Sequence, residues 1–184
     1  LLPLIEGDED AASKRVQEIV AQYPDLFQKA YLKGLRRKLG LQTEQEGDQA
    51  LAEDLLNEMT RESVDYTVTF RNLSAVGPSI SGEDTQAGKV FKNLKGFREW
   101  IVRWNKRVGE DGVHEATCED VMRSVNPAVI PRNHLVEEAI KFAVDEGDYS
   151  YFHKLVEIIE RPYDEAGFST KYALPPRPEE EVTQ

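Results

Sequence analysis

The chain has 184 residues, 40% of them hydrophobic and 31% charged, so it has enough apolar material for one folded core. A formal net charge of −11 argues against nucleic-acid binding over a broad surface, because phosphate binding depends on cationic side chains. No apolar run approaches membrane-spanning length, and the single cysteine, Cys118, excludes an internal disulfide framework. We expect a cytoplasmic protein without membrane contact, or a mitochondrial one if the source is eukaryotic.

The chain begins Leu1-Leu2-Pro3 rather than with methionine, so we expect a fragment whose true N-terminus is missing. Helical periodicity follows, and Pro24 is expected to break the first helical stretch into two. The two apolar stripes are Ala12, Val16, Ile19, Val20 and Tyr23, then Phe27, Ala30, Tyr31 and Leu35.

Gly47 and Asp48 predict the start of the next helix, with Asp48 as its N-cap. Residues 64–70 alternate apolar and polar side chains as a strand does, but Tyr66, Phe70 and Leu73 also share a helical face. A lone strand would have no partner in an otherwise helical chain. We therefore expect residues 64–73 to be helical.

Glycine, proline and serine residues in 74–89 predict a flexible loop. A strongly amphipathic helix should follow, with Asn93 as its cap and Phe97 and Trp104 on its apolar face. Thr117 and Asp120 resemble a capping box that opens a short helix ending at Val125.

After residues 126–130 the chain should turn from an extended segment into another helix, with Pro131 at its first position. Arg132 would then lie in the first turn, where the helix dipole disfavours a cation by about 0.3–1 kcal/mol. We therefore expect Arg132 to bind a carboxylate, and we favour a partner within this chain over one in a missing domain.

A last helix should run from Asp148 to Pro162. The fold class predicted by these patterns is all-α: an irregular orthogonal array of about seven helices in one domain, residues 1–174. Residues 175–184, rich in proline and glutamate, should form an extended or disordered tail.

No catalytic, cofactor-binding or metal-binding residue can be assigned from the sequence. Residues 114–118 contain half of a zinc-protease motif, but Cys118 stands where the second histidine is required. None of His114, His134 and His153 has the Glu-x-x-His spacing of a di-iron bundle. No glycine-rich phosphate-binding loop occurs.

The most cationic stretch, residues 89–107, has seven Lys or Arg against one acid, Glu99, with aromatic residues between them. That combination is typical of single-stranded nucleic-acid binding. Because Phe97 and Trp104 fall on the apolar stripe, a place in the core explains them better. Nucleic-acid binding is therefore the weakest of the alternatives.

A series of short motifs, in its order and spacing, resembles the C-terminal region of the selenoprotein O family, also called YdiU. The likeness runs from about residue 28 to 176. The motifs are residues 37–41, 62–71, 126–133, 146–148, 161–164 and 175–176, together with Trp100, Arg103 and Trp104.

The resemblance implies a magnesium-dependent adenylyltransferase with a kinase-like fold, which transfers AMP from ATP to Ser, Thr or Tyr of target proteins. The family's nucleotide- and metal-binding residues lie upstream of the matched region. ATP and Mg²⁺ are thus implied for the parent protein, and this chain alone is expected to bind neither. The family's C-terminal cysteine or selenocysteine also has no counterpart, since Cys118 does not match its position.

The implied function is that of a helical C-terminal domain supporting the kinase-like lobe. Its partners would be that N-terminal lobe and the protein substrates of the parent. The alternative is a free-standing helical adaptor that binds a partner peptide. The motifs single out candidate contacts with the missing lobe: Asp65, Tyr66, Arg71, Asn126, Pro127, Arg132 and Asn133.

Overall fold

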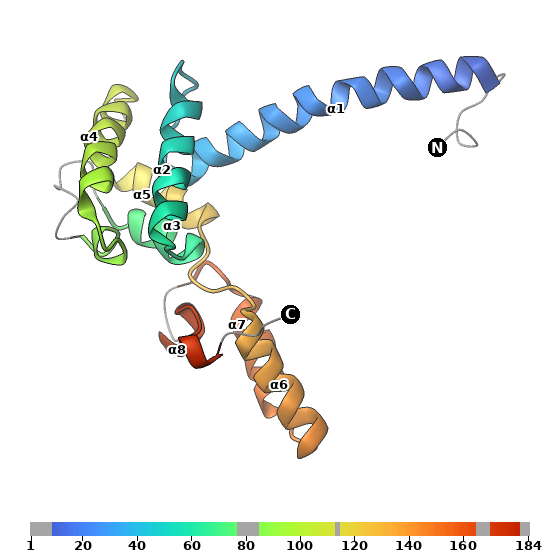
Figure 1. The fold of residues 1–184 in the computed structure, drawn as a ribbon, viewed down its shortest axis with the longest axis vertical. Coiled ribbons are helices and arrows are strands. Elements are labelled where there is room, and N and C mark those ends of the chain that lie inside the picture. Colours follow the sequence, from blue (N-terminus) through green and yellow to red (C-terminus); the bar gives the residue numbers. More distant parts are fainter. Residues whose placement is uncertain (1–8, 77–84, 113–114, 165–169, 181–184) are drawn as a thin grey trace. The chain divides into compact units, whose positions relative to one another are not determined.

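The computed structural model describes residues 9–76, 85–112, 115–164 and 170–180 (Figure 1). Within these ranges it contains eight α-helices and no β-strand, so the all-α prediction is confirmed. The helices are α1 (Glu9–Lys38), α2 (Asp48–Glu62), α3 (Tyr66–Leu73), α4 (Leu94–Glu110), α5 (Glu115–Val125), α6 (Asn133–Asp145), α7 (Ser150–Ile159) and α8 (Thr170–Ala173), with 3-10 turns η3 (Gly88–Val90) and η4 (Pro178–Glu180). No described helix is both long and apolar enough to cross a membrane.

The chain divides into two compact units, Leu1–Leu35 and Arg36–Gln184. The described part of the first unit is α1 up to Leu35. The expected break at Pro24 is wrong, because α1 continues through it as one helix of 30 residues. The rings of Tyr23, Phe27 and Tyr31 stack at four-residue spacing across the proline, with 6.0 Å between successive centroids, and such pairs stabilise helix. Their contacts offset part of the hydrogen bonding that the proline removes.

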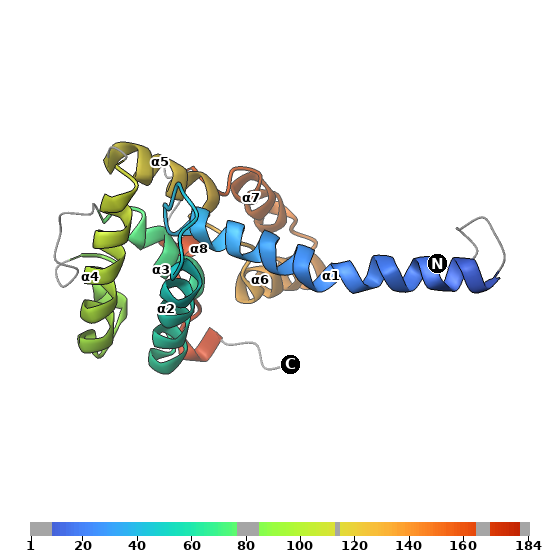
Figure 2. The same ribbon diagram turned by 90° about the horizontal axis from the view of Figure 1, so that it is seen from above.

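The core of the second unit lies between α2 and α4, which run side by side (Figures 1 and 2). Phe97, Trp100 and Trp104 of α4 are fully buried, as is Leu55 of α2. Both indole N–H groups donate to buried backbone carbonyls, Trp100 to Leu51 at 2.7 Å and Trp104 to Leu39 at 2.8 Å. The two indoles therefore combine a large apolar surface with satisfied polar groups.

Asn93 caps α4 as predicted, since its side chain accepts a hydrogen bond from the Lys95 N–H. The expected capping box at Thr117 and Asp120 is wrong, because α5 already begins at Glu115 and both residues lie inside the helix. Residues 66–73 are helical as predicted and form α3. Half of the predicted loop at 74–89, residues 77–84, lies outside the described residues, and its described end includes part of η3.

Helices α6 and α7 form a hairpin, joined by a turn in which Gly147 has a φ of 67°. The rings of Phe142 and Tyr151 stack across it at 3.9 Å. The tail after residue 174 is less extended than predicted, since Arg177 and Glu180 close the turn η4 with a guanidinium–carboxylate contact of 2.6 Å. Hydrogen bonds from Arg177 lower the pKa of Glu180 to about 2.

Candidate functional site

The strongest contact among the residues singled out by sequence joins Asp65 to Arg132. Two guanidinium nitrogens of Arg132 donate to the two carboxylate oxygens of Asp65, at 2.8 and 3.1 Å. Arg132 also donates to the Ala173 carbonyl at 2.9 Å, and its side chain is only 6% exposed. The prediction that Arg132 binds a carboxylate of this chain is confirmed.

The position of Arg132 in the helix differs from the prediction. Helix α6 begins at Asn133, and Arg132 precedes it in the cap position with extended backbone. The Arg132 carbonyl accepts from the N–H groups of Leu135 and Val136, which is the role of a cap residue. Its side chain reaches back to α3, so the unfavourable first-turn position that motivated the prediction does not arise.

Asp65 caps α3 while it binds Arg132. Its carboxylate accepts from the Val68 N–H at 2.8 Å. Burial opposes ionisation of Asp65, but the hydrogen bonds from Arg132 and Val68 outweigh it and hold its pKa below the ordinary value. One carboxylate therefore both starts α3 and ties it to the base of the α6–α7 hairpin.

Asn126 is the centre of a second contact set and is completely buried. Its amide nitrogen donates to the Lys38 carbonyl at 2.9 Å and to the Ser74 hydroxyl at 3.4 Å, and its oxygen accepts from the Lys38 ammonium at 3.1 Å. Burial lowers the pKa of Lys38, whose ammonium lies 5.4 Å from the ring centres of Tyr66 and of Phe70. Asn126 thus joins the end of α1, the end of α3 and the segment after α5.

Arg71 holds the same segment from α3. It donates to the carbonyls of Arg123 at 3.1 Å, Asn126 at 2.8 Å and Tyr163 at 3.0 Å. The Pro162 carbonyl accepts from the Ala128 N–H at 2.7 Å, so the chain before α6 lies beside the chain after α7. Of the seven residues singled out, five thus take part in the two contact sets: Asp65 and Arg132 in the first, and Tyr66, Arg71 and Asn126 in the second.

The other two residues contribute less. Pro127 is half-buried in the segment between α5 and α6, and Asn133 is the exposed first residue of α6. These side chains were selected as contacts to another lobe, and that role stays a prediction. The described contacts of the other five are within the chain.

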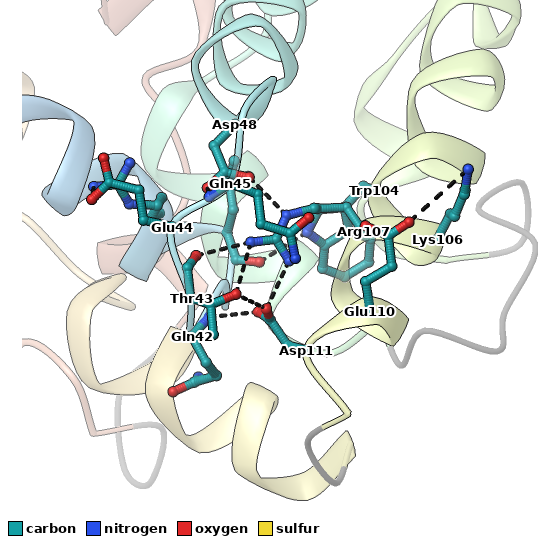
Figure 3. Close-up of polar contacts among 12 residues, drawn as sticks. Gln42, Thr43, Glu44, Gln45, Asp48, Trp104, Lys106, Arg107, Glu110 and Asp111 are labelled. Carbon is teal, nitrogen blue, oxygen red and sulfur yellow. Dashed lines mark hydrogen bonds and ion pairs between the residues drawn. The ribbon is translucent and has the colours of Figure 1, made fainter.

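A third polar cluster, which sequence reasoning missed, surrounds Arg107 at the end of α4 (Figure 3). Its guanidinium donates to Asp48 at 2.7 Å, to Asp111 at 2.8 Å and to the Thr43 carbonyl at 2.8 Å. The Thr43 hydroxyl and the Gln42 N–H also donate to Asp111. The sequence contained one signal for it, the spacing of four residues between Arg107 and Asp111.

Asp48 was predicted as the N-cap of α2, and this is wrong. Gly47 occupies the cap position, and Asp48 is the buried first residue of the helix. Its carboxylate binds Arg107 across the core and also accepts from the Gln45 N–H at 3.0 Å. Burial opposes charge on both Arg107 and Asp111. Their hydrogen bonds nevertheless raise the pKa of Arg107 and lower that of Asp111.

These clusters hold helices together and show no catalytic arrangement. Among the described residues, no three His, Cys, Asp or Glu side chains come together so that they could hold a metal ion. Arg107 and Arg132 are both bound to carboxylates, so a phosphate could bind either arginine only by displacing its carboxylate partner. The described side chains of these three clusters therefore do not fit a magnesium-nucleotide site.

The half zinc-protease motif and the basic stretch were the remaining candidates from sequence. His114 lies outside the described residues, and Cys118 is a buried residue of α5 whose thiol lies 3.6 Å from the Gly40 carbonyl. In the basic stretch 89–107, Phe97, Trp100 and Trp104 are fully buried and so cannot stack on bases.

Comparisons with family models and with known protein sequences point to the same family. The family model described as Protein adenylyltransferase SelO matches residues 4–160. Three relatives carry the name Protein nucleotidyltransferase YdiU. The protein from Bradyrhizobium diazoefficiens is 39% identical to this chain over 184 residues, that from Rhizobium etli 40% over 182 residues, and that from Nitrobacter winogradskyi 42% over 184 residues. These matches cover 99–100% of this chain but only 36–37% of each relative, so the chain spans little more than a third of their length.

Proposed function

The chain belongs to the SelO family of protein adenylyltransferases, and we propose that it is the helical domain that supports the catalytic part of such an enzyme. The observation that carries the proposal is the match itself: almost all of this chain aligns with little more than a third of each relative. The polar clusters fit a supporting role, because their charges are used to join helices rather than to line a site. The nucleotide and its metal would then be bound elsewhere in the longer protein.

In this proposal the whole enzyme uses ATP and Mg²⁺ to transfer AMP to hydroxyl side chains of target proteins. The chain's own residues contribute rigid helices and surfaces, and no chemical step is assigned to them. A cytoplasmic location is proposed with it, because a single cysteine, Cys118, allows no disulfide within this chain and fits a reducing compartment.

One feature of the first unit supports attachment to a further domain. Helix α1 leaves large apolar side chains about half exposed along its length: Ile19, Val20, Tyr23, Leu26, Phe27 and Tyr31. An apolar stripe of this extent is typical of a surface that another structure covers. The same stripe would suit a free-standing adaptor, which is the alternative function.

The two functions are separated by dividing the full-length protein into its upstream part and this 184-residue chain. AMP transfer to a protein target is measured for the upstream part alone, for this chain alone, and for both expressed together. We expect transfer only when both are present. If the upstream part alone transfers AMP at the full-length rate, the supporting role is wrong and the adaptor function stands.

A further inference from the structure

The α6–α7 hairpin carries an apolar groove with a volume of about 460 Å³. Its ten lining residues are all apolar or aromatic and come from neighbouring faces of the two helices, with Pro131 before α6 and Tyr149 in the connecting turn. Three of them remain substantially exposed: Ile140 at 48%, Phe152 at 50% and Tyr149 at 58%. Val144, one turn beyond Ile140 on α6, is 76% exposed.

A continuous apolar surface of this kind differs from ordinary exposed apolar residues. Single exposed side chains such as Val102 on α4 are normal in soluble proteins and require no explanation. Several large ones that share a groove between two helices indicate a surface that is covered in the functional protein. A groove between two helices suits a third helix laid along it with its apolar face inward.

The charge around the groove limits what can cover it. Residues 133–160 contain seven Asp or Glu and only two Lys. Glu137 lies three residues before Ile140 on α6, and Glu160, the cap residue after α7, lies four residues after Val156. Both glutamates are exposed. A complementary segment would have an apolar ridge with Lys or Arg at its edges.

The chemistry of the lining favours a permanent partner over a transient one. Transient interfaces mix polar and apolar groups, whereas permanent ones resemble a protein core cut in half. This chain spans only 36–37% of the length of its relatives, so a full-length relative has ample further polypeptide to cover the groove.

We propose that the α6–α7 groove is the docking site for the catalytic part of the same polypeptide, which lays a basic-edged amphipathic helix along it. This inference rests on the proposed supporting function and names the surface through which support is given. The groove is pre-organised for this, because the base of the hairpin is fixed to α3 through Arg132–Asp65 and through Arg71.

Site-specific thiol labelling of the full-length protein tests the proposal. Ile140→Cys places the probe in the groove, and Val102→Cys, at a site 67% exposed on α4, is the matched control. N-ethylmaleimide labelling is followed on the corresponding peptides by mass spectrometry, so that the buried Cys118 does not interfere. We expect Ile140→Cys to react at least about tenfold more slowly in the full-length protein than in the 184-residue chain, since reaction then requires local opening. Val102→Cys should react equally in both.

Two outcomes overturn the inference. In one, Ile140→Cys reacts equally fast in the full-length protein and in the short chain while AMP transfer is intact, which leaves the proposed function standing. In the other, labelling of Ile140→Cys in the 184-residue chain alone becomes slower as the protein concentration rises, which means that a second copy covers the groove. Failure of the proposed function appears separately, as AMP transfer by the upstream part alone.

A second pair of variants gives an independent result. Ile140→Glu combined with Phe152→Glu should lower the melting temperature of the full-length protein and leave that of the short chain unchanged, because both side chains are half exposed there. Val102→Glu should change neither. An unchanged full-length melting temperature in the double variant contradicts the docking site.

Discussion

Replacing Arg107 by alanine should destabilise this chain more than any other single loss of a charge described above. The guanidinium lies between two carboxylates whose side chains are almost fully buried, 2% exposed in Asp48 and 1% in Asp111. Without Arg107, both carboxylates stay in the core with no cation beside them. Removal of one partner from a buried ion pair costs about 3–5 kcal/mol.

Arg103 supplies a matched control on the same helix. It binds Asp54 at 2.7 Å, the same distance as the closest contact of Arg107, but its side chain is 53% exposed and that of Asp54 is 45% exposed. Solvent screens such a pair, so Arg103→Ala should cost only about 0.2–1 kcal/mol. The two substitutions therefore remove the same side chain from one helix, Arg107 from a buried cluster with two carboxylates and Arg103 from an exposed pair with one.

Urea unfolding followed by circular dichroism at pH 7 measures both variants against the parent chain. A loss of 3–5 kcal/mol in a chain of this size corresponds to a fall in melting temperature of about 6–20 °C. Arg107→Lys should recover only part of the loss, because a lysine cannot replace the forked contacts with both carboxylates and the Thr43 carbonyl. If Arg107→Ala and Arg103→Ala prove equally mild, the buried cluster contributes no more than a surface pair and the reasoning fails.

Four further outcomes are expected for this chain. Arg132→Ala should lower its unfolding free energy by about 1.5–3 kcal/mol through loss of the Asp65 contacts, whereas Asn133→Ala next to it should change little; equal effects in a denaturant titration would contradict the role of the pair. Asn126→Ala should cost about 1–3 kcal/mol by the same measurement, because it leaves buried partners unpaired, and an unchanged midpoint would contradict this. Because the pKa of Asp65 is lowered in the folded chain, its contribution to the unfolding free energy is complete above its unfolded-state pKa and is lost as pH falls from about 5 through its folded pKa. Asp65→Asn should therefore flatten the dependence of the unfolding free energy on pH in this range, as measured by urea titrations at several pH values. Millimolar Mg-ATP should not raise the melting temperature of the chain, and a clear increase in scanning fluorimetry would show a nucleotide site.

The pattern of apolar residues was sufficient to predict α2 to α7 and much of the core, but not α8. Phe97 and Trp104 were placed inward by their spacing alone, and residues 66–73 were assigned to a helix because a strand would have had no neighbour. Local rules failed where a contact from another part of the helix or chain decided the outcome. Pro24 predicts a break, but α1 continues through it, and the rings of Tyr23 and Phe27 stack across the proline.

The polar clusters were harder to predict for the same reason. Asp48 has the position of an N-cap by sequence, yet its carboxylate binds Arg107, which is 59 residues away along the chain. Arg132 was predicted to bind a carboxylate of this chain, but sequence gave no means of choosing Asp65 among 34 acidic residues. Such choices depend on how helices pack, which the periodicity of one helix does not specify.

The contacts of Arg71 bear on how this chain tolerates changes in the length of the α6–α7 hairpin. Its guanidinium binds the carbonyls of Asn126 and Tyr163, so the chain leaves the core and returns to it at nearly the same point. The entropy of closing a loop grows only slowly with its length once the two ends are held together. Insertions or deletions of whole turns in α6 and α7 should therefore leave the α2–α4 core of this chain folded.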